Sequence, residues 1–220
     1  MNFEKKINKI EQKENEPKIE VLKGSEAPEE SRKNPFYSSY FWAMADWENK
    51  KLYLPDNSDE AISFSVAAHE LGHLVNRGRI QPSRFEFEPG HKEELRAWKE
   101  GWQYLEKHLS DYYGQQDAAE DLLKIKNRIE EEFLRITKLT APFYKKTELS
   151  PNEQRGNFLS TTTGKEIKKS IDELRDKVAK IVNELDLNQY LNKIDWNKYK
   201  EVVNKALLDI EKDNEENFEN

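Results

Sequence analysis

The 220-residue chain contains no cysteine. This absence excludes a disulfide framework and a thiolate metal site, so any metal ion would have to be bound by histidine, aspartate or glutamate. Histidine is also scarce, with four residues in the whole chain. Two histidines that occur close together are therefore the first place to look for a metal site.

The chain also lacks long apolar runs and an excess of basic residues. No stretch approaches the roughly 18 apolar residues that a membrane span needs, and the first twenty residues contain no uninterrupted apolar stretch that could serve as a signal sequence. We therefore expect a cytoplasmic protein without a membrane partner. The net charge of -7 and the pI near 5.4 give no electrostatic reason to expect nucleic acid as a partner.

Apolar residues are sparse overall. Hydrophobic residues make up 35% of the chain and charged residues 36%, with a mean hydropathy of -1.02. Such a chain must concentrate its apolar residues in stripes, which favours helices with broad solvated faces. The predicted fold class is α+β and mostly helical, with a small core of short strands and two active-site helices followed by a helical C-terminal region.

Composition divides the chain into three regions. Residues 1–33 are charged and poor in large apolar residues, which predicts a flexible arm with one short ordered piece at Ile19–Leu22. Residues 34–112 are rich in aromatics and predict the core. This core begins with two strands, about Phe41–Ala45 and Lys51–Leu54, joined by a polar turn.

Two helices complete the predicted core. The stretch NSDE supplies a capping residue and early acids for a helix of about Asp59–Arg77, which Gly78 stops. After Pro89–Gly90 a second helix is expected over about Lys92–Leu109. Its apolar stripe is formed by large residues: Leu95, Trp98, Trp102, Leu105 and Leu109.

Residues 113–220 show helical periodicity only. Apolar residues recur every three or four positions in three stretches, which predicts bundle or coiled-coil packing. These residues are Leu122, Ile125, Ile129, Phe133 and Ile136, then Ile167, Ile171, Leu174, Val178, Ile181 and Leu185, then Tyr199, Val203, Ala206 and Ile210. The polar segment 141–164 is either a mobile connection or a functional loop, and its two prolines and polar run favour the mobile connection. The acidic tail from Glu211 is expected to fray. The helices could bind a protein partner or self-associate.

The run VAAHELGHLV at residues 66–75 contains two histidines four positions apart, with a glutamate directly after the first. On a helix His73 lies about 40° around the axis from His69 and Glu70 about 100°, so all three side chains project into one sector. The opposite side is an apolar face formed by Phe64, Ala67, Ala68, Leu71, Leu74 and Val75. We therefore expect the apolar face of this helix to pack against the rest of the protein. The imidazoles on the other side would point into a cleft, where they can share a zinc ion.

The second helix offers a third ligand. By the same angular count Glu94 lies within about 60° of the centre of the apolar stripe, whereas Glu93 lies on the far side. A carboxylate at the edge of a core-facing stripe must be paired or bind a cation, so Glu94 is the first candidate, with Glu93 and His91 as alternatives. Ala97 and Gly101 flank the stripe and would let the two helices approach closely.

These motifs carry a family resemblance. HELGH followed by the acid in EELRAW resembles the gluzincin branch of zinc metallopeptidases, in particular the small cores of minigluzincins and ImmA/IrrE-like proteins. The resemblance covers about residues 36–110 and implies two strands before the first helix and a Glu-x-x-small pattern on the second, here Glu94 to Ala97. Trp98 stands four residues after Glu94, where larger gluzincins have an acid, so the usual carboxylate partner of a ligand histidine is not evident.

The resemblance implies a zinc-dependent peptidase. His69, His73 and Glu94 would hold Zn²⁺, and Glu70 would be the general base that activates the attacking water. A peptide or protein substrate could add as an extended strand to either predicted strand. The candidates for an oxyanion donor are His91, His108, Tyr53 and Tyr113.

Two other classes of function are compatible with the sequence. The first is a regulatory or protein-interaction module with a zincin-like fold, which would bind zinc with little or no proteolytic activity. The second is a purely helical interaction protein in which the motif is accidental. Metal content separates them, because only the accidental motif predicts no stoichiometric zinc.

Overall fold

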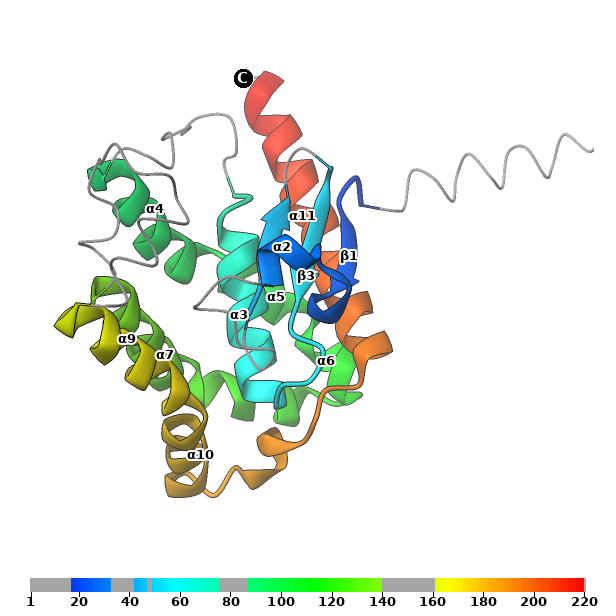
Figure 1. Ribbon diagram of the computed structural model, residues 1–220. Helices are drawn as coiled ribbons and strands as arrows, with labels where there is room; N and C mark the ends of the chain where they lie inside the picture. Colours follow the sequence, from blue (N-terminus) through cyan, green and yellow to red (C-terminus); the bar gives the residue numbers. More distant parts are fainter. Residues whose placement is uncertain (1–16, 33–41, 47–48, 76–86, 140–160, 220) are drawn as a thin grey trace, which may run out of the picture.

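The computed structural model describes residues 17–32, 42–46, 49–75, 87–139 and 161–219, with the side chains of 87–91 and 217–219 excepted. The described residues are mostly helical and include a small three-stranded sheet (Figure 1), which confirms the predicted fold class. Among the described residues, no helix combines the length and apolar character that crossing a bilayer requires.

The sheet consists of β1 (Glu20–Lys23), β2 (Met44–Asp46) and β3 (Lys51–Leu54). Its order is β1-β3-β2, with β1 parallel and β2 antiparallel to β3. β3 has the predicted bounds, whereas β2 starts three residues later than expected, and Phe41 lies outside the described residues. β3 is the central strand of this sheet and is paired along both edges, so it cannot accept a further strand.

The central helix α3 (Glu60–Gly72) carries the motif, and Asp59 is its N-cap. It was predicted to reach Arg77 but ends at Gly72, with His73 as C-cap. The final turn tightens, since the Leu74 N–H donates to the carbonyl of Leu71 at 2.9 Å, an i to i+3 bond typical of helix ends.

α3 is buried on every side instead of on one face. Glu70 is the only residue of the helix that is not buried. The six residues of the expected apolar face are all buried, which confirms that face. The rest of α3 is covered as well, because the sheet lies on one side of the helix and several helices lie on the others (Figure 1). These helices include α4 (Phe87–Glu100), α5 (Trp102–Leu105) and α7 (Gln116–Leu139).

The second core helix is broken where one continuous helix was predicted. α4 is followed at Gly101 by α5, the 3₁₀ turn η2 (Glu106–His108) and α6 (Leu109–Tyr113). α4 also starts earlier than expected, with Pro89 in its first turn, where the missing N–H has no helical partner to lose. Gly101, between α4 and α5, lies in close contact with α3.

The remaining elements pack around this core. They are η1 (Gly24–Glu26), α2 (Glu29–Arg32), α9 (Thr162–Asp172), α10 (Leu174–Glu184), η4 (Asn188–Leu191) and α11 (Trp196–Glu219). The predicted apolar stretches are buried on α7, α9, α10 and α11, except that Leu185 is 40% exposed because it follows the end of α10. α9 and α10 pack on α7, while α11 packs on α5, α6 and β1.

The structure also differs from the prediction at the end of the connecting segment and in the acidic tail. Most of the segment interpreted as a mobile connection lies outside the described residues, but its last part begins α9, where the Thr161 side chain accepts from the Gly164 N–H at 3.0 Å. α11 continues through the acidic tail that was expected to fray. Tertiary contacts stabilise it, since Tyr104 donates to Asp213 at 2.9 Å and Asn214 donates to the Leu74 carbonyl at 2.9 Å.

Candidate metal centre

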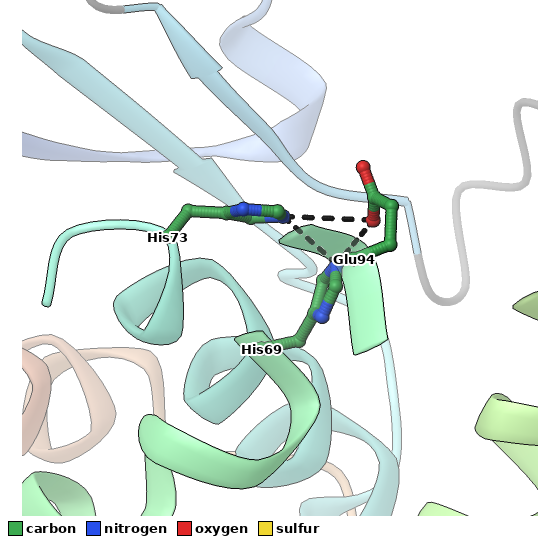
Figure 2. A group of neighbouring side chains, drawn as sticks. All are labelled: His69, His73 and Glu94. Atoms are coloured by element: carbon green, nitrogen blue, oxygen red, sulfur yellow. Dashed lines mark hydrogen bonds and ion pairs between the residues drawn. The ribbon is translucent and has the colours of Figure 1, made fainter. Parts of the chain in front are cut away.

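Three side chains from two helices converge on one point (Figure 2). His69 and His73 come from α3 and its C-cap, and Glu94 comes from α4. The Nε2 atoms of the two histidines lie 3.2 Å apart. Oε2 of Glu94 lies 3.1 Å from Nε2 of His69 and 3.6 Å from Nε2 of His73. The structure therefore brings together the two motif histidines and the predicted third residue.

The spacing of these atoms fits a metal ion. Around a tetrahedral zinc with bonds of about 2.0–2.1 Å, ligand atoms are about 3.3–3.4 Å apart, close to the three distances observed. All three atoms carry lone pairs, so their mutual contact needs a proton or a cation between them. His69, His73 and Glu94 thus form a group that could hold a metal ion.

Small residues bring the two helices close enough for this convergence. A Cβ added to Gly72 would lie 2.0 Å from the carbonyl oxygen of Ala97, and one added to Gly101 would lie 1.6 Å from that of Ala68. No side chain fits at either position. The predicted role of Ala97 and Gly101 in a close approach is confirmed, and Gly72 completes the contact from α3.

Glu93 was predicted to lie on the far side of α4, and this prediction is wrong. The way in which α4 crosses α3 turns Glu93 toward His73. Oε1 of Glu93 lies 3.2 Å from Nδ1 of His73. The large apolar residues predict one inner face of α4, but the face that crosses α3 is formed by the small residues Ala97 and Gly101. Glu93 and Glu94 flank that face one helical turn before Ala97, so both reach His73.

Glu93 supplies the carboxylate partner that the sequence did not reveal. With Nδ1–H of His73 donated to Glu93, Nε2 of His73 keeps its lone pair for a metal ion. Arg96 holds this carboxylate, with Nε donating to Oε2 at 2.8 Å, and also donates to the Gly72 carbonyl at 3.0 Å. Glu100 pairs with Arg96 from the next turn.

The electrostatics of the centre favour a positive charge. Burial opposes a charged imidazolium, but the neighbouring carboxylates of Glu93 and Glu94 outweigh it and raise the pKa of His73 to about 10. Burial also opposes the two carboxylates, yet His73 and Arg96 lower the pKa of Glu93 to about 2, and the two imidazoles hold the pKa of Glu94 well below its usual range. A bound cation would provide the same compensation.

His69 is held differently from His73. Its side chain is buried, and its Nδ1 has no hydrogen-bond partner among the described residues. The imidazole stacks on the indole of Trp98, with ring centroids 4.1 Å apart and an interplanar angle of 24°. Trp98 and Trp102 are both buried, as expected for core residues.

Glu70 lies beside this cluster. Its negative charge is one of the influences that raise the pKa of His73, and it is the residue of α3 with access to solvent. The carboxylate therefore acts on the same site as the three converging side chains. It does not belong to the converging group itself.

The candidate oxyanion donors are engaged in packing or in other contacts. Nε2 of His108 lies 3.0 Å from a carboxylate oxygen of Asp209. Tyr113 packs among aromatic rings, and Tyr53 on β3 is 3% exposed. The side chain of His91 lies outside the part of the chain that the structure describes. None of the described candidates belongs to the converging group.

Comparison with protein-family models, with curated proteins and with solved structures gives no match. The resemblance to gluzincins therefore rests on the motif and on the geometry around it. The described residues establish a mostly helical chain with a small mixed sheet and a His-His-Glu group that could hold a metal ion.

Proposed function

We propose that the protein is a zinc-dependent metallopeptidase. The observation that carries this proposal is that Glu94, from a separate helix, meets both histidines of the HELGH motif at 3.1 and 3.6 Å. An accidental motif gives no reason for a third ligand to converge on it. The second carboxylate behind His73 adds support, because a ligand histidine ordinarily donates its other N–H to such a group.

The chain's own residues have distinct tasks in this proposal. His69, His73 and Glu94 would hold Zn²⁺, which supplies Lewis acidity that lowers the pKa of water and polarises a peptide carbonyl. Glu70 accepts the proton of the attacking water and passes it to the leaving amine. Glu93 keeps His73 in the tautomer that leaves Nε2 free.

The substrate class is an extended peptide. β3 is already paired on both sides, whereas β2 lies at the edge of the sheet. β1, at the other edge, contacts α11. We therefore assign docking to the outer edge of β2, where backbone groups can pair with a peptide in extended conformation.

The test compares purified wild type with Glu70→Gln and His73→Ala. Each is assayed for bound metal and for digestion of a peptide library. We expect stoichiometric zinc in the wild type and in Glu70→Gln, with cleavage lowered about 10²–10⁴-fold in Glu70→Gln because only the general base is lost. His73→Ala should lose both the bound zinc and the peptide cleavage.

The outcomes separate the alternatives. Cleavage that persists equally in all three preparations would come from a contaminant. Zinc without cleavage by the wild type would favour a regulatory module that binds metal. A wild type without stoichiometric zinc would overturn the proposal and leave a helical interaction protein with an accidental motif.

A further inference from the structure

Three rings form a continuous stack behind the metal centre. His69 lies against one face of Trp98 at 4.1 Å, and Phe133 lies against Trp98 at 4.5 Å with an interplanar angle of 29°. Trp98 and Phe133 are 5% and 6% exposed, so the stack is shielded from water. The rings belong to three helices, α3, α4 and α7.

The indole of Trp98 is also fixed in its own plane. Its Nε1–H donates to the hydroxyl of Thr137 at 3.1 Å, and that hydroxyl donates to the carbonyl of Phe133 at 3.0 Å. Both residues are one turn apart on α7. A single helical turn of α7 therefore sets the position and the rotation of the indole.

The two histidines thus differ in how their rings are oriented. His73 has a carboxylate on Nδ1, whereas the buried Nδ1 of His69 lacks a partner among the described residues. The Nε2 side of the His69 ring faces Glu94 and the ring of His73, whose centroid lies 4.6 Å away. The contact that orients the ring from outside the converging group is the face of Trp98. Offset stacking of aromatic rings restricts rotation about the Cβ–Cγ bond and is worth more than the area it buries.

We propose that Trp98 is the positioning residue of His69 and that α7 holds Trp98 in place. The helical region after residue 113 then controls the metal affinity of the centre through Phe133 and Thr137. The stack replaces, for His69, the hydrogen bond that Glu93 provides for His73. This inference rests on the proposed function only in requiring that the centre binds zinc, and it does not require peptide cleavage.

The test measures zinc affinity of the full chain by competition with a chromophoric chelator. Trp98→Leu should bind zinc about 10- to 100-fold more weakly, the usual effect of losing a group that orients a metal ligand. Trp98→Phe keeps an aromatic face against His69 and should restore affinity to within about threefold of wild type. Phe133→Leu removes only the outer ring and should give an intermediate loss.

Trp102→Leu is the matched control. Trp102 is 3% exposed, stands one turn after Trp98 and has the ammonium of Lys126 over its ring at 5.7 Å. Its loss should lower thermal stability as much as the loss of Trp98 does, and leave zinc affinity unchanged. Equal weakening by Trp98→Leu and Trp102→Leu would mean a general packing effect and would overturn the inference.

Tryptophan fluorescence provides a second measurement, which reports the distance of Trp98 from the bound metal and does not depend on packing alone. Co²⁺ added to the wild type should quench tryptophan fluorescence more than in Trp98→Phe, because Trp98 is the indole in contact with a ligand ring. Unchanged zinc affinity in a folded Trp98→Leu variant would refute the positioning role while leaving the metal centre intact. A wild type that binds no zinc would refute the centre itself.

Discussion

Two adjacent glutamates on α4 have different roles because each reaches a different nitrogen of the same histidine. Glu94 approaches Nε2 of His73, on the side where the ligand atoms converge, and Glu93 approaches Nδ1 on the opposite side of the ring. The two carboxylates therefore enclose the imidazole. One is placed to bind a metal ion, and the other is placed to orient the ring that binds it.

Glu93→Gln should lower zinc affinity about tenfold, because the amide keeps the shape of the side chain and loses the charge that favours N–H donation from His73. Glu100→Gln is the control, since Glu100 pairs with Arg96 from the next turn. Chelator competition on both variants measures the difference. If both bind zinc as the wild type does, the contact of Glu93 with His73 has no effect on the metal.

At the scale of elements, the centre depends on how closely α3 and α4 approach each other. Glycines at 72 and 101 face backbone carbonyls on the opposite helix. Without a Cβ on these residues the two backbones are in direct contact, which places Glu94 within reach of both histidines. A wider crossing would move the carboxylate away from the imidazoles, so helix packing and ligand geometry depend on the same residues.

Gly101→Ala should lower the free energy of unfolding by about 3 kcal/mol, because its Cβ would overlap the Ala68 carbonyl and force the helices apart. Zinc affinity should fall with it. Gly114→Ala is the control: its φ of +70° costs an alanine about 1 kcal/mol, and nothing lies within 4 Å of the added Cβ. Zinc affinity in that variant should be unchanged. Urea denaturation and zinc titration check both expectations.

The first residue of α3 is a buried acid. Glu60 is 8% exposed, and the hydroxyl of Tyr112 donates to it at 3.3 Å. Burial raises its pKa from the ordinary value of 4.5 to about 7, although the hydroxyls of Tyr113 and Tyr112 and the charge of Lys198 oppose the shift; the charge of Asp59 adds to it. The folded protein therefore holds this proton more tightly than the unfolded chain does.

This shift makes stability depend on pH. The contribution of the Glu60 proton to the free energy of unfolding is fully present below pH 4.5 and is lost as the pH rises to about 7. The change is on the order of 3 kcal/mol. Glu60→Gln removes the titrating group, so its stability relative to wild type should rise over the same interval. Urea denaturation at several pH values measures the difference, and parallel stability curves for the two proteins would contradict it.

At the scale of the whole molecule, one hydrophobic cluster connects the sheet, the motif helix and the C-terminal helices. It extends from Ile19 before β1 to Ile210 on α11. The centre lies where α3, α4 and α7 meet within this cluster. A metal ion bound there would link helices that are distant in the sequence, so metal binding and global stability should be coupled.

Zinc at 100 times its dissociation constant should therefore raise the free energy of unfolding by about 2.7 kcal/mol. For a chain of this length the midpoint of thermal unfolding should rise by about 5–10 °C. Circular dichroism melts with zinc and with a chelator measure the shift. His69→Ala is the control for zinc bound elsewhere, and an equal shift in that variant would rule out the proposed centre as its source.

The sequence by itself determined the features that depend on neighbours along the chain. The spacing of His69 and His73 places them on one side of a helix because 3.6 residues complete a turn. The same periodicity predicted the buried residues of α7 and α11, and the run Lys51–Leu54 predicted β3. Such features need no knowledge of what packs against the segment.

Only the tertiary structure decided the features that depend on how segments cross. The rotation of α4 about its axis brings Glu93 to His73, and it follows from glycine contacts that a count of large apolar residues does not detect. The pairing of β1 with β3 and the stack of Trp98 on His69 join distant parts of the chain. Their physical reason is the same, since backbone contact and ring stacking depend on the relative placement of whole elements.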